Sequence, residues 1–173
     1  LRIVCLLVGI LLLGEFRPRI APALSRLDRA NAAYAAVAAQ AQAEGRVPRG
    51  LAIPLWPGDS HWSSLYEYYA SLYRIRMVNG YSPAVKKSYI DEVFWRFESA
   101  NTGYLSNDQL DDLARRGIRG VLLHEGAFPE KVSPFPVAFT LRNLIQNPRL
   151  EFLGQANGVW AFGIGDTARA RGA

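Results

Sequence analysis

Cysteine, histidine and methionine are all scarce in this sequence. Its 173 residues include one cysteine, Cys5, one methionine and two histidines. A single cysteine excludes both a disulfide within the chain and a zinc site built from cysteines, so cysteine usage does not indicate a compartment. With so few thiol and imidazole ligands, we predict neither a metal site nor a cofactor.

Clusters of one charge are also missing from the sequence. The formal net charge of +5 would allow contact with nucleic acid or anionic lipid. The arginines are nevertheless dispersed, and the closest pairs are Arg74 with Arg76 and Arg115 with Arg116. We interpret both pairs as ordinary solvated positions. No nucleic-acid-binding motif accompanies the charge, so the sequence predicts no nucleic-acid partner.

A long hydrophobic run is the third absence. The longest run covers residues 3–13 and is followed by Gly14-Glu15. A complete transmembrane helix needs roughly 20 apolar residues, so this run cannot span a bilayer alone. We favour the second half of a final transmembrane helix, because the sequence begins with Leu1 and the run ends abruptly.

Two other interpretations of this leader remain open. A signal peptide would have Arg2 as its basic start and Ala21-Pro22-Ala23 as its cleavage region. A buried core helix would also fit the length. The two arginines that follow the run, Arg17 and Arg19, are more typical of a cytoplasmic flank than of an external one.

The remaining sequence is that of a folded domain. Half of the residues are hydrophobic and a fifth are charged, which excludes a disordered chain and leaves room for one domain with an appended element. Apolar periodicity and capping signals predict helices over 25–44, 60–73, 82–97, 106–117 and 135–147, and strands over 51–55, 76–78, 118–124, 149–153 and 159–164.

Strands that alternate with helices predict the α/β class. We expect a small mixed sheet of about 4–5 strands, flanked by helices, that ends in an antiparallel hairpin at Asn157-Gly158 and is preceded by the truncated apolar helix. The expected organisation is the end of a transmembrane helix or a signal-like leader at 1–16, an Ala-rich connecting helix and turn at 17–50, an α/β domain at 51–165 and a polar tail at 166–173.

Candidate catalytic residues are few, and each has a simpler explanation. His124-Glu125 follows a predicted parallel strand, at the edge where α/β proteins place ligands, so a general base is conceivable there. Asp59 and His61 follow another strand and could join them in a metal or acid/base cluster, although the spacing of these residues does not support a metal site. The simpler explanation is that His124 closes the loop into Gly126.

Candidate binding residues surround the same edge. Trp56, Trp62, Tyr66 and Tyr81 could stack on sugar rings or on a partner, although helical spacing equally predicts that they belong to the core. Asn79 completes this candidate set. The dipeptide Asn79-Gly80 is also explained as a type I′ turn, which requires a positive φ at both positions.

The order of these segments resembles a known family. Glu15 follows the apolar run, and then come Ile53-Pro54-Leu55, Asn79-Gly80-Tyr81-Ser82 and the segment from Leu113 to His124. This pattern is similar to the carboxy-terminal extramembrane region of bacterial GT-C-type glycosyltransferases, which are protein-mannosyltransferase-like integral membrane proteins. The likeness covers essentially the whole chain, but each motif is short and none is catalytic.

The resemblance implies a non-catalytic extramembrane domain on the periplasmic or extracellular face of the bacterial inner membrane. The parent enzyme would use a polyprenyl-phosphate sugar, and the family's catalytic acidic residues lie in an amino-terminal loop with no counterpart here. The implied partners are the membrane-embedded part of the parent chain and a lipid-linked sugar or glycan acceptor. The alternatives are a stand-alone secreted or membrane-surface binding domain and a small hydrolase centred on His124 and Glu125.

Overall fold

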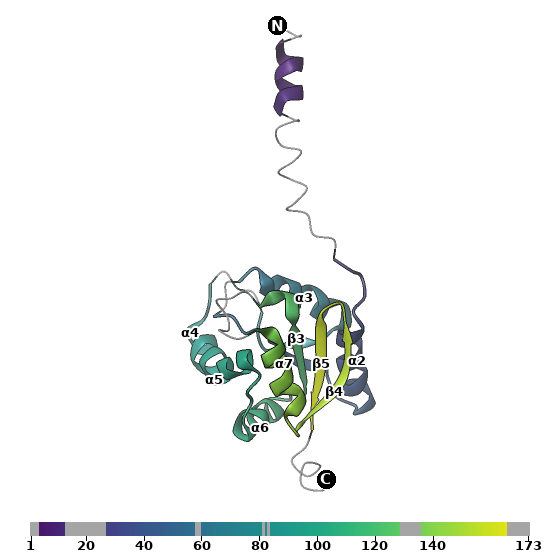
Figure 1. Ribbon diagram of the computed structural model, residues 1–173, viewed down its shortest axis with the longest axis vertical. Helices are drawn as coiled ribbons and strands as arrows, with labels where there is room; N and C mark the ends of the chain where they lie inside the picture. The colour runs from purple at the N-terminus through teal and green to yellow at the C-terminus, as the bar shows by residue number, and fades with distance from the viewer. Residues whose placement is uncertain are drawn as a thin grey trace.

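The fold is a five-stranded mixed sheet with helices on both faces (Figure 1). The computed structural model describes residues 4–12, 27–57, 60–80, 82, 84–128 and 136–165. The sheet ends in an antiparallel pair of strands, and an apolar helix over 4–12 precedes the domain. The predicted α/β class is therefore confirmed.

The strand order is β2-β1-β3-β5-β4. β1 (Arg49–Ile53) pairs in parallel with both β2 (Arg76–Met77) and β3 (Gly120–His124). β5 (Val159–Ile164) pairs antiparallel with β3, and β4 (Leu150–Ala156) pairs antiparallel with β5 at the outer edge. β1 and β3 lie in the interior of the sheet, which explains why their sequences are almost continuously apolar.

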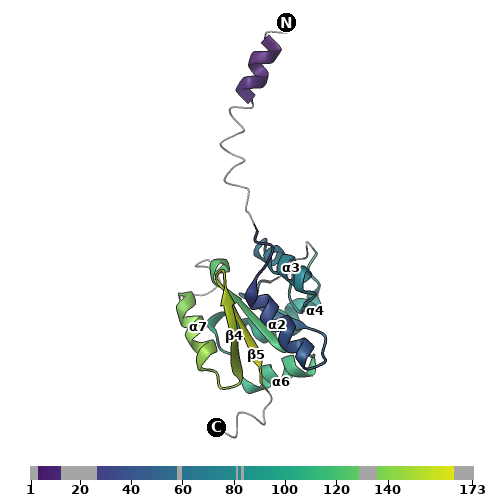
Figure 2. The same ribbon diagram turned by 90° about the vertical axis from the view of Figure 1, so that its right-hand side faces the viewer.

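Four helices and one composite helical stretch cover the sheet. The helices are α2 (Ala32–Ala43), α3 (Trp62–Tyr73), α6 (Asn107–Arg115) and α7 (Val137–Gln146). The composite stretch contains α4 (Lys87–Tyr89), the π-helical turn η2 (Ile90–Phe94), α5 (Trp95–Phe97) and the 3-10 turn η3 (Glu98–Thr102). A second 3-10 turn, η4 (Glu125–Ala127), follows β3. Figures 1 and 2 show α2 and α7 on opposite sides of the sheet.

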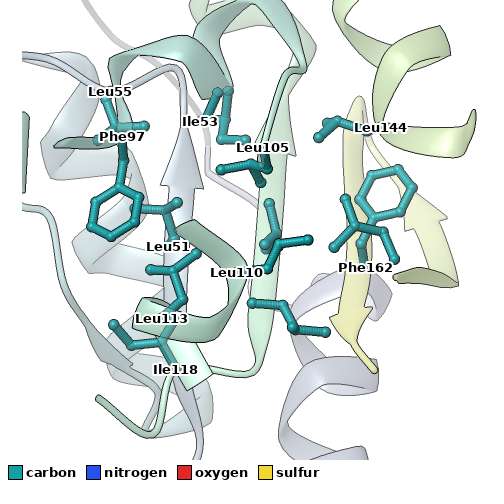
Figure 3. Close-up of a cluster of buried hydrophobic side chains, with 14 of the residues drawn as sticks. Leu51, Ile53, Leu55, Phe97, Leu105, Leu110, Leu113, Ile118, Leu144 and Phe162 are labelled. Atoms are coloured by element: carbon teal, nitrogen blue, oxygen red, sulfur yellow. The ribbon is translucent and has the colours of Figure 1, made fainter. Parts of the chain in front are cut away.

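The larger core lies between the sheet and the helices α5, α6 and α7 (Figure 3). Side chains alternate along each strand, so Leu51 and Ile53 of β1 point to this face while Ala52 points to the other. The fully buried side chains on this side include Leu51, Ile53, Leu55, Phe97, Leu110, Leu113, Leu144 and Phe162.

A thinner core lies between the sheet and the helices α2 and α3. It combines alanines and Val37 of α2 with Tyr69 and Ala70 of α3 and with Leu122 of β3. The alanine-rich helix α2 packs on β3, β4 and β5. The approach is close, because a Cβ added at Gly120 would lie 2.5 Å from Cγ1 of Val37.

Helix α2 begins seven residues later than the sequence predicts. Asn31 is its N-cap, and the Asn31 side chain accepts a hydrogen bond from the N–H of Ala33 at 3.0 Å. At the other end Gly45 has a φ of +64°, and the N–H of Arg46 donates to the carbonyl of Ala41 at 2.8 Å. Gly45 therefore ends the helix in the left-handed conformation that favours glycine after a helix.

A capping box opens α6, and the predicted hairpin at Asn157-Gly158 is confirmed. Ser106 and Gln109 form a reciprocal capping box at the start of α6. Asn157 and Gly158, which join β4 to β5, have φ values of 51° and 70°. These positive values at both central residues are those of the type I′ turn that closes a hairpin.

The predicted turn at Asn79-Gly80 is wrong in its type. Neither residue has a positive φ, and Asn79 is buried with its side chain bonded to β1. The helix predicted to begin at residue 82 also starts later. The hydroxyl of Ser82 donates to the carbonyl of Ala84 at 2.9 Å, and the helix begins at Lys87.

The apolar leader contains a helix over residues 4–12 whose side chains are mostly exposed. No helix in the described ranges is both long enough and apolar enough to cross a membrane. The predicted domain boundary at residue 16 and the predicted polar tail at 166–173 lie outside the described residues.

Candidate functional site

The predicted site lies at the carboxyl edge of the sheet, which we define as the side where β1 and β3 end. The chain leaves β1 toward α3 on one face and leaves β3 toward α7 on the other. A point where neighbouring parallel strands send their connections to opposite faces is where open α/β sheets bind ligands. Topology therefore supports the choice of this edge as the candidate site.

His124 ends β3 and points toward α2 and α3. Only 3% of its surface is exposed. Its Nε2 lies 2.8 Å from the hydroxyl of Tyr34, which comes from α2, and its ring centre lies 4.6 Å from that of Tyr66, which comes from α3. The imidazole is thus enclosed by aromatic side chains from both helices.

Burial keeps this pair uncharged. Loss of hydration lowers the pKa of His124 to about 3 and raises the pKa of Tyr34 far above its usual range. Near neutral pH the histidine and the tyrosine therefore share a hydrogen bond between two neutral groups. A general base that operates near neutrality needs a pKa close to that pH, and His124 lacks one.

Tyr66 and Trp56 hold the segment that follows β1. The hydroxyl of Tyr66 donates to the carbonyl of Pro54 at 3.1 Å, and Nε1 of Trp56 donates to the Tyr66 hydroxyl at 3.4 Å. The hydroxyl of Tyr89 donates to the carbonyl of Trp56 at 2.9 Å, and burial raises the pKa of Tyr89 to about 12. These bonds anchor the main chain beyond β1 and leave Trp56 half-buried.

Trp62 lies in the first turn of α3 and is also half-buried. It packs with Trp56 against a small cluster of Ala52, Tyr66 and Ala127. His61 is exposed, and its ring centre lies 5.0 Å from that of Trp62. Trp56, Trp62 and Tyr66 are thus brought together, as predicted for a group surrounding this edge.

Glu125 is directed away from His124. Nε1 of Trp160 donates to the Glu125 carboxylate, and the backbone N–H of Glu125 donates to the carbonyl of Gly158 at 2.8 Å. Trp160 packs on the larger core, on the opposite face of the sheet from Tyr34. The side chains of His124 and Glu125 therefore pack on opposite faces of the sheet. Two other candidates, Asp59 and Tyr81, lie outside the described residues.

Asn79 acts on the backbone of β1. Its side-chain amide accepts from the N–H of Ala52 at 2.9 Å and donates to the carbonyl of the same residue at 2.8 Å. Asn101 does the same for Leu55, with distances of 2.6 Å and 3.0 Å. The two amides pair with backbone groups of β1 and its continuation, where β2 is too short to supply partners.

Metal binding finds no support in the described residues, because they contain no group of three or more His, Cys, Asp and Glu side chains that could hold an ion. What the edge offers is a rigid, neutral network with two half-buried tryptophans. Flat aromatic faces of this kind suit contact with a partner surface or a sugar ring.

The sequence did not indicate the partners of the predicted residues. Tyr34 lies 90 positions before His124, and Asn101 lies 46 positions after Leu55. Asn101 lies in the polar segment 98–103, so nothing in the local sequence marked it as a partner of Leu55. Comparisons of the chain with protein-family models, with curated proteins and with solved structures found no match.

Proposed function

We propose that this chain is a non-catalytic extramembrane domain of a membrane glycosyltransferase-like protein that uses a polyprenyl-phosphate sugar. In this proposal it packs on the membrane-embedded catalytic part of its parent chain and shapes access of the donor or acceptor. The observation that carries the proposal is that the two acid/base candidates are both engaged internally, His124 with Tyr34 and Glu125 with Trp160.

The route by which the chain enters the domain also supports the proposal. Asn31 donates to the carbonyl of Ala156 at 3.5 Å, and Asn157 donates to the carboxylate of Asp28 at 2.9 Å. The chain therefore reaches the domain at the β4–β5 turn, on the carboxyl edge of the sheet (Figure 1). In this proposal, the membrane that holds the apolar leader faces this same edge.

The aromatic residues of that edge have the chemistry of an interfacial contact. Trp56 and Trp62 are half-buried, and Leu27 is 40% exposed where the described chain enters. Tryptophan is enriched at membrane–water interfaces and at protein–protein contacts because one end of its ring is apolar and the other is polar. The proposal assigns these two tryptophans to contact with the membrane-embedded part.

A transfer assay tests the division between catalysis and docking. Membranes that contain the parent chain would be supplied with a labelled polyprenyl-phosphate sugar and an acceptor. We expect Glu125→Gln to retain transfer within about twofold, because the amide can still accept from Trp160. Trp56→Ala should raise the KM for the acceptor. A loss of roughly a hundredfold in kcat for a folded Glu125→Gln variant would contradict the proposal.

Fractionation tests the tethering. The 173-residue chain expressed in bacteria should co-sediment with membranes at neutral pH, and a variant with Leu6, Leu7 and Leu11 changed to serine should be released. Exposed Leu72 changed to serine serves as the matched control and should leave the wild-type distribution unchanged. Cleavage after Ala23 with release of the product would instead support a stand-alone secreted binding domain.

A further inference from the structure

The opposite edge of the sheet, where the parallel strands begin, gathers arginines that are dispersed in the sequence. We call this side the amino edge. Arginine precedes or opens each of the three parallel strands: Arg46 and Arg49 at β1, Arg74 and Arg76 at β2, and Arg115, Arg116 and Arg119 at β3. Neighbouring parallel strands begin at the same edge, so the topology brings these residues together.

Three of these side chains line one cleft of about 280 Å³. The cleft is lined by Arg49, Arg76, Met77, Val78, Arg116 and Ile118, and no carboxylate is among these described residues. Arg49 and Arg76 are direct neighbours in the register of β1 and β2. Like charges in such positions are destabilising unless an anion lies between them.

Two of the three arginines of the cleft are held in place by the surrounding structure. Nη1 of Arg49 donates to the carbonyl of Arg116 at 2.8 Å. The Arg116 guanidinium donates to both carboxylate oxygens of Asp112, at 3.2 Å and 3.1 Å, and lies over the ring of Phe97. Side chains fixed in this way lose less conformational entropy when they bind a ligand.

Asp112 is already committed to neighbouring arginines. Desolvation raises its pKa, but the hydrogen bond from Arg116 and the charges of Arg116, Arg115 and Arg96 outweigh that effect and lower the pKa overall. One carboxylate therefore faces three guanidiniums, and positive charge remains in excess beside the cleft.

Helix ends explain only some of these arginines. Basic residues stabilise a helix carboxyl terminus through the helix dipole, which accounts for Arg74 after α3 and for Arg115 and Arg116 at α6. Arg49 and Arg76 open strands, where no such dipole acts. Their convergence with Arg116 therefore needs a different explanation.

We propose that this cleft binds a phosphate group through Arg49, Arg76 and Arg116. Guanidinium groups match phosphate oxygens in a bidentate geometry, and the cleft has room for a mono- or diphosphate rather than for an extended polymer. The bound phosphate neutralises the convergent charges. This site is independent of the proposed membrane-docking role, since it lies on the other edge of the sheet.

Titration calorimetry of the full chain with sodium pyrophosphate tests the proposal, at fixed ionic strength because surface charge is screened by salt. The test variant is Arg76→Gln, whose exposed position on the short β2 should not affect folding. The matched control is Arg142→Gln, an equal loss of charge on the exposed surface of α7. We expect Arg76→Gln to weaken pyrophosphate binding by about tenfold or more and Arg142→Gln to have no effect.

A vesicle arm identifies the source of the phosphate. Wild type and Arg76→Gln are sedimented with phosphatidylcholine vesicles that contain or lack phosphatidylglycerol, because the basic leader contributes equally to both proteins. If Arg76→Gln loses only the extra vesicle binding that phosphatidylglycerol provides, the ligand is a lipid headgroup. If Arg76→Gln instead loses only pyrophosphate binding, the ligand is a soluble phosphate. Absence of both effects in the wild-type chain, or equal losses in Arg142→Gln, would overturn the proposal.

Discussion

At the scale of single residues, the structure predicts a distinctive acid sensitivity. Burial holds the pKa of His124 at about 3, whereas the same side chain in the unfolded chain titrates near 6.5. Below pH 6.5 the unfolded chain gains a proton that the folded chain does not, so His124 supports full stability above that pH. We expect stability to fall as the pH drops below 6.5, by up to roughly 1 kcal/mol per pH unit through this residue alone.

Chemical denaturation across this pH range measures the effect. The variant His124→Gln keeps a hydrogen-bonding partner for Tyr34 but has no group that titrates, so its stability should lack this slope. The control is His61→Gln, because the only other histidine is exposed and should keep the wild-type slope. An identical pH dependence in wild type and His124→Gln would contradict the assignment.

Two Asn-Gly dipeptides show what a local sequence can and cannot reveal. Asn157-Gly158 forms the type I′ turn that the sequence predicts, because two strands of similar length flank it. Asn79-Gly80 has the same letters but follows a strand of two residues, and Asn79 bonds to unpaired backbone groups of β1 instead. Whether Asn79 forms a turn or bonds to β1 depends on which strand is adjacent to β1. The local sequence does not carry that information.

This difference predicts that substitutions at Asn79 and Asn157 change stability by very different amounts. Asn79→Ala leaves a buried N–H and a buried carbonyl of Ala52 without partners and should cost roughly 2–4 kcal/mol of unfolding free energy. Asn157→Gly should change stability by less than about 0.5 kcal/mol, because glycine adopts a positive φ readily and the lost bond to Asp28 is exposed. Thermal denaturation of both variants gives the comparison, and similar losses would contradict it.

At the scale of elements, α2 packs closely on β3. Gly120→Ala would place a methyl group 2.5 Å from Cγ1 of Val37, a branched side chain with little freedom to move. We expect a loss of about 1–3 kcal/mol from overpacking. Adding Val37→Ala should recover at least about 1 kcal/mol relative to the sum of the single variants, since both act at one contact.

Gly126→Ala is the matched control for this double-mutant cycle. An added Cβ at Gly126 meets no atom within 4 Å, so the substitution should change stability by less than about 0.5 kcal/mol. If the changes in unfolding free energy of Gly120→Ala and Val37→Ala were strictly additive, the contact between these two residues would not be what limits the approach of α2 to β3.

Most elements were predictable from capping residues and periodicity. The Ser106–Gln109 capping box and the Asn157-Gly158 turn specify their own backbone geometry, and the confirmed fold class follows from the alternation of strands and helices. The start of the helix after β2 was not predictable. Ser82 has the side chain of an N-cap, but here it bonds to Ala84, and the helix starts five residues later.

At the scale of the whole molecule, the strand order determines which functional side chains lie close together. The end of β3 was predictable as a candidate site, and it does meet Trp56 and Tyr66. The basic cleft was not predictable, because Arg49, Arg76 and Arg116 appear dispersed until β2, β1 and β3 are known to be neighbours. The sheet therefore has a neutral aromatic carboxyl edge and a basic amino edge.

The same strand order predicts which strands unfold locally and which unfold only with the whole domain. β1, β3 and β5 occupy the middle of the sheet, with helices packed on both faces, so their amides can exchange only when the whole domain unfolds. β2 has two residues at one border and α4 has no buried residue, so both should exchange through local opening. Hydrogen exchange in increasing denaturant should give the amides of β1, β3 and β5 one common free energy, equal to that of global unfolding. If the amides of β2 shared that value, the border strand would unfold with the core, and the aromatic edge and the basic cleft would form one cooperative unit.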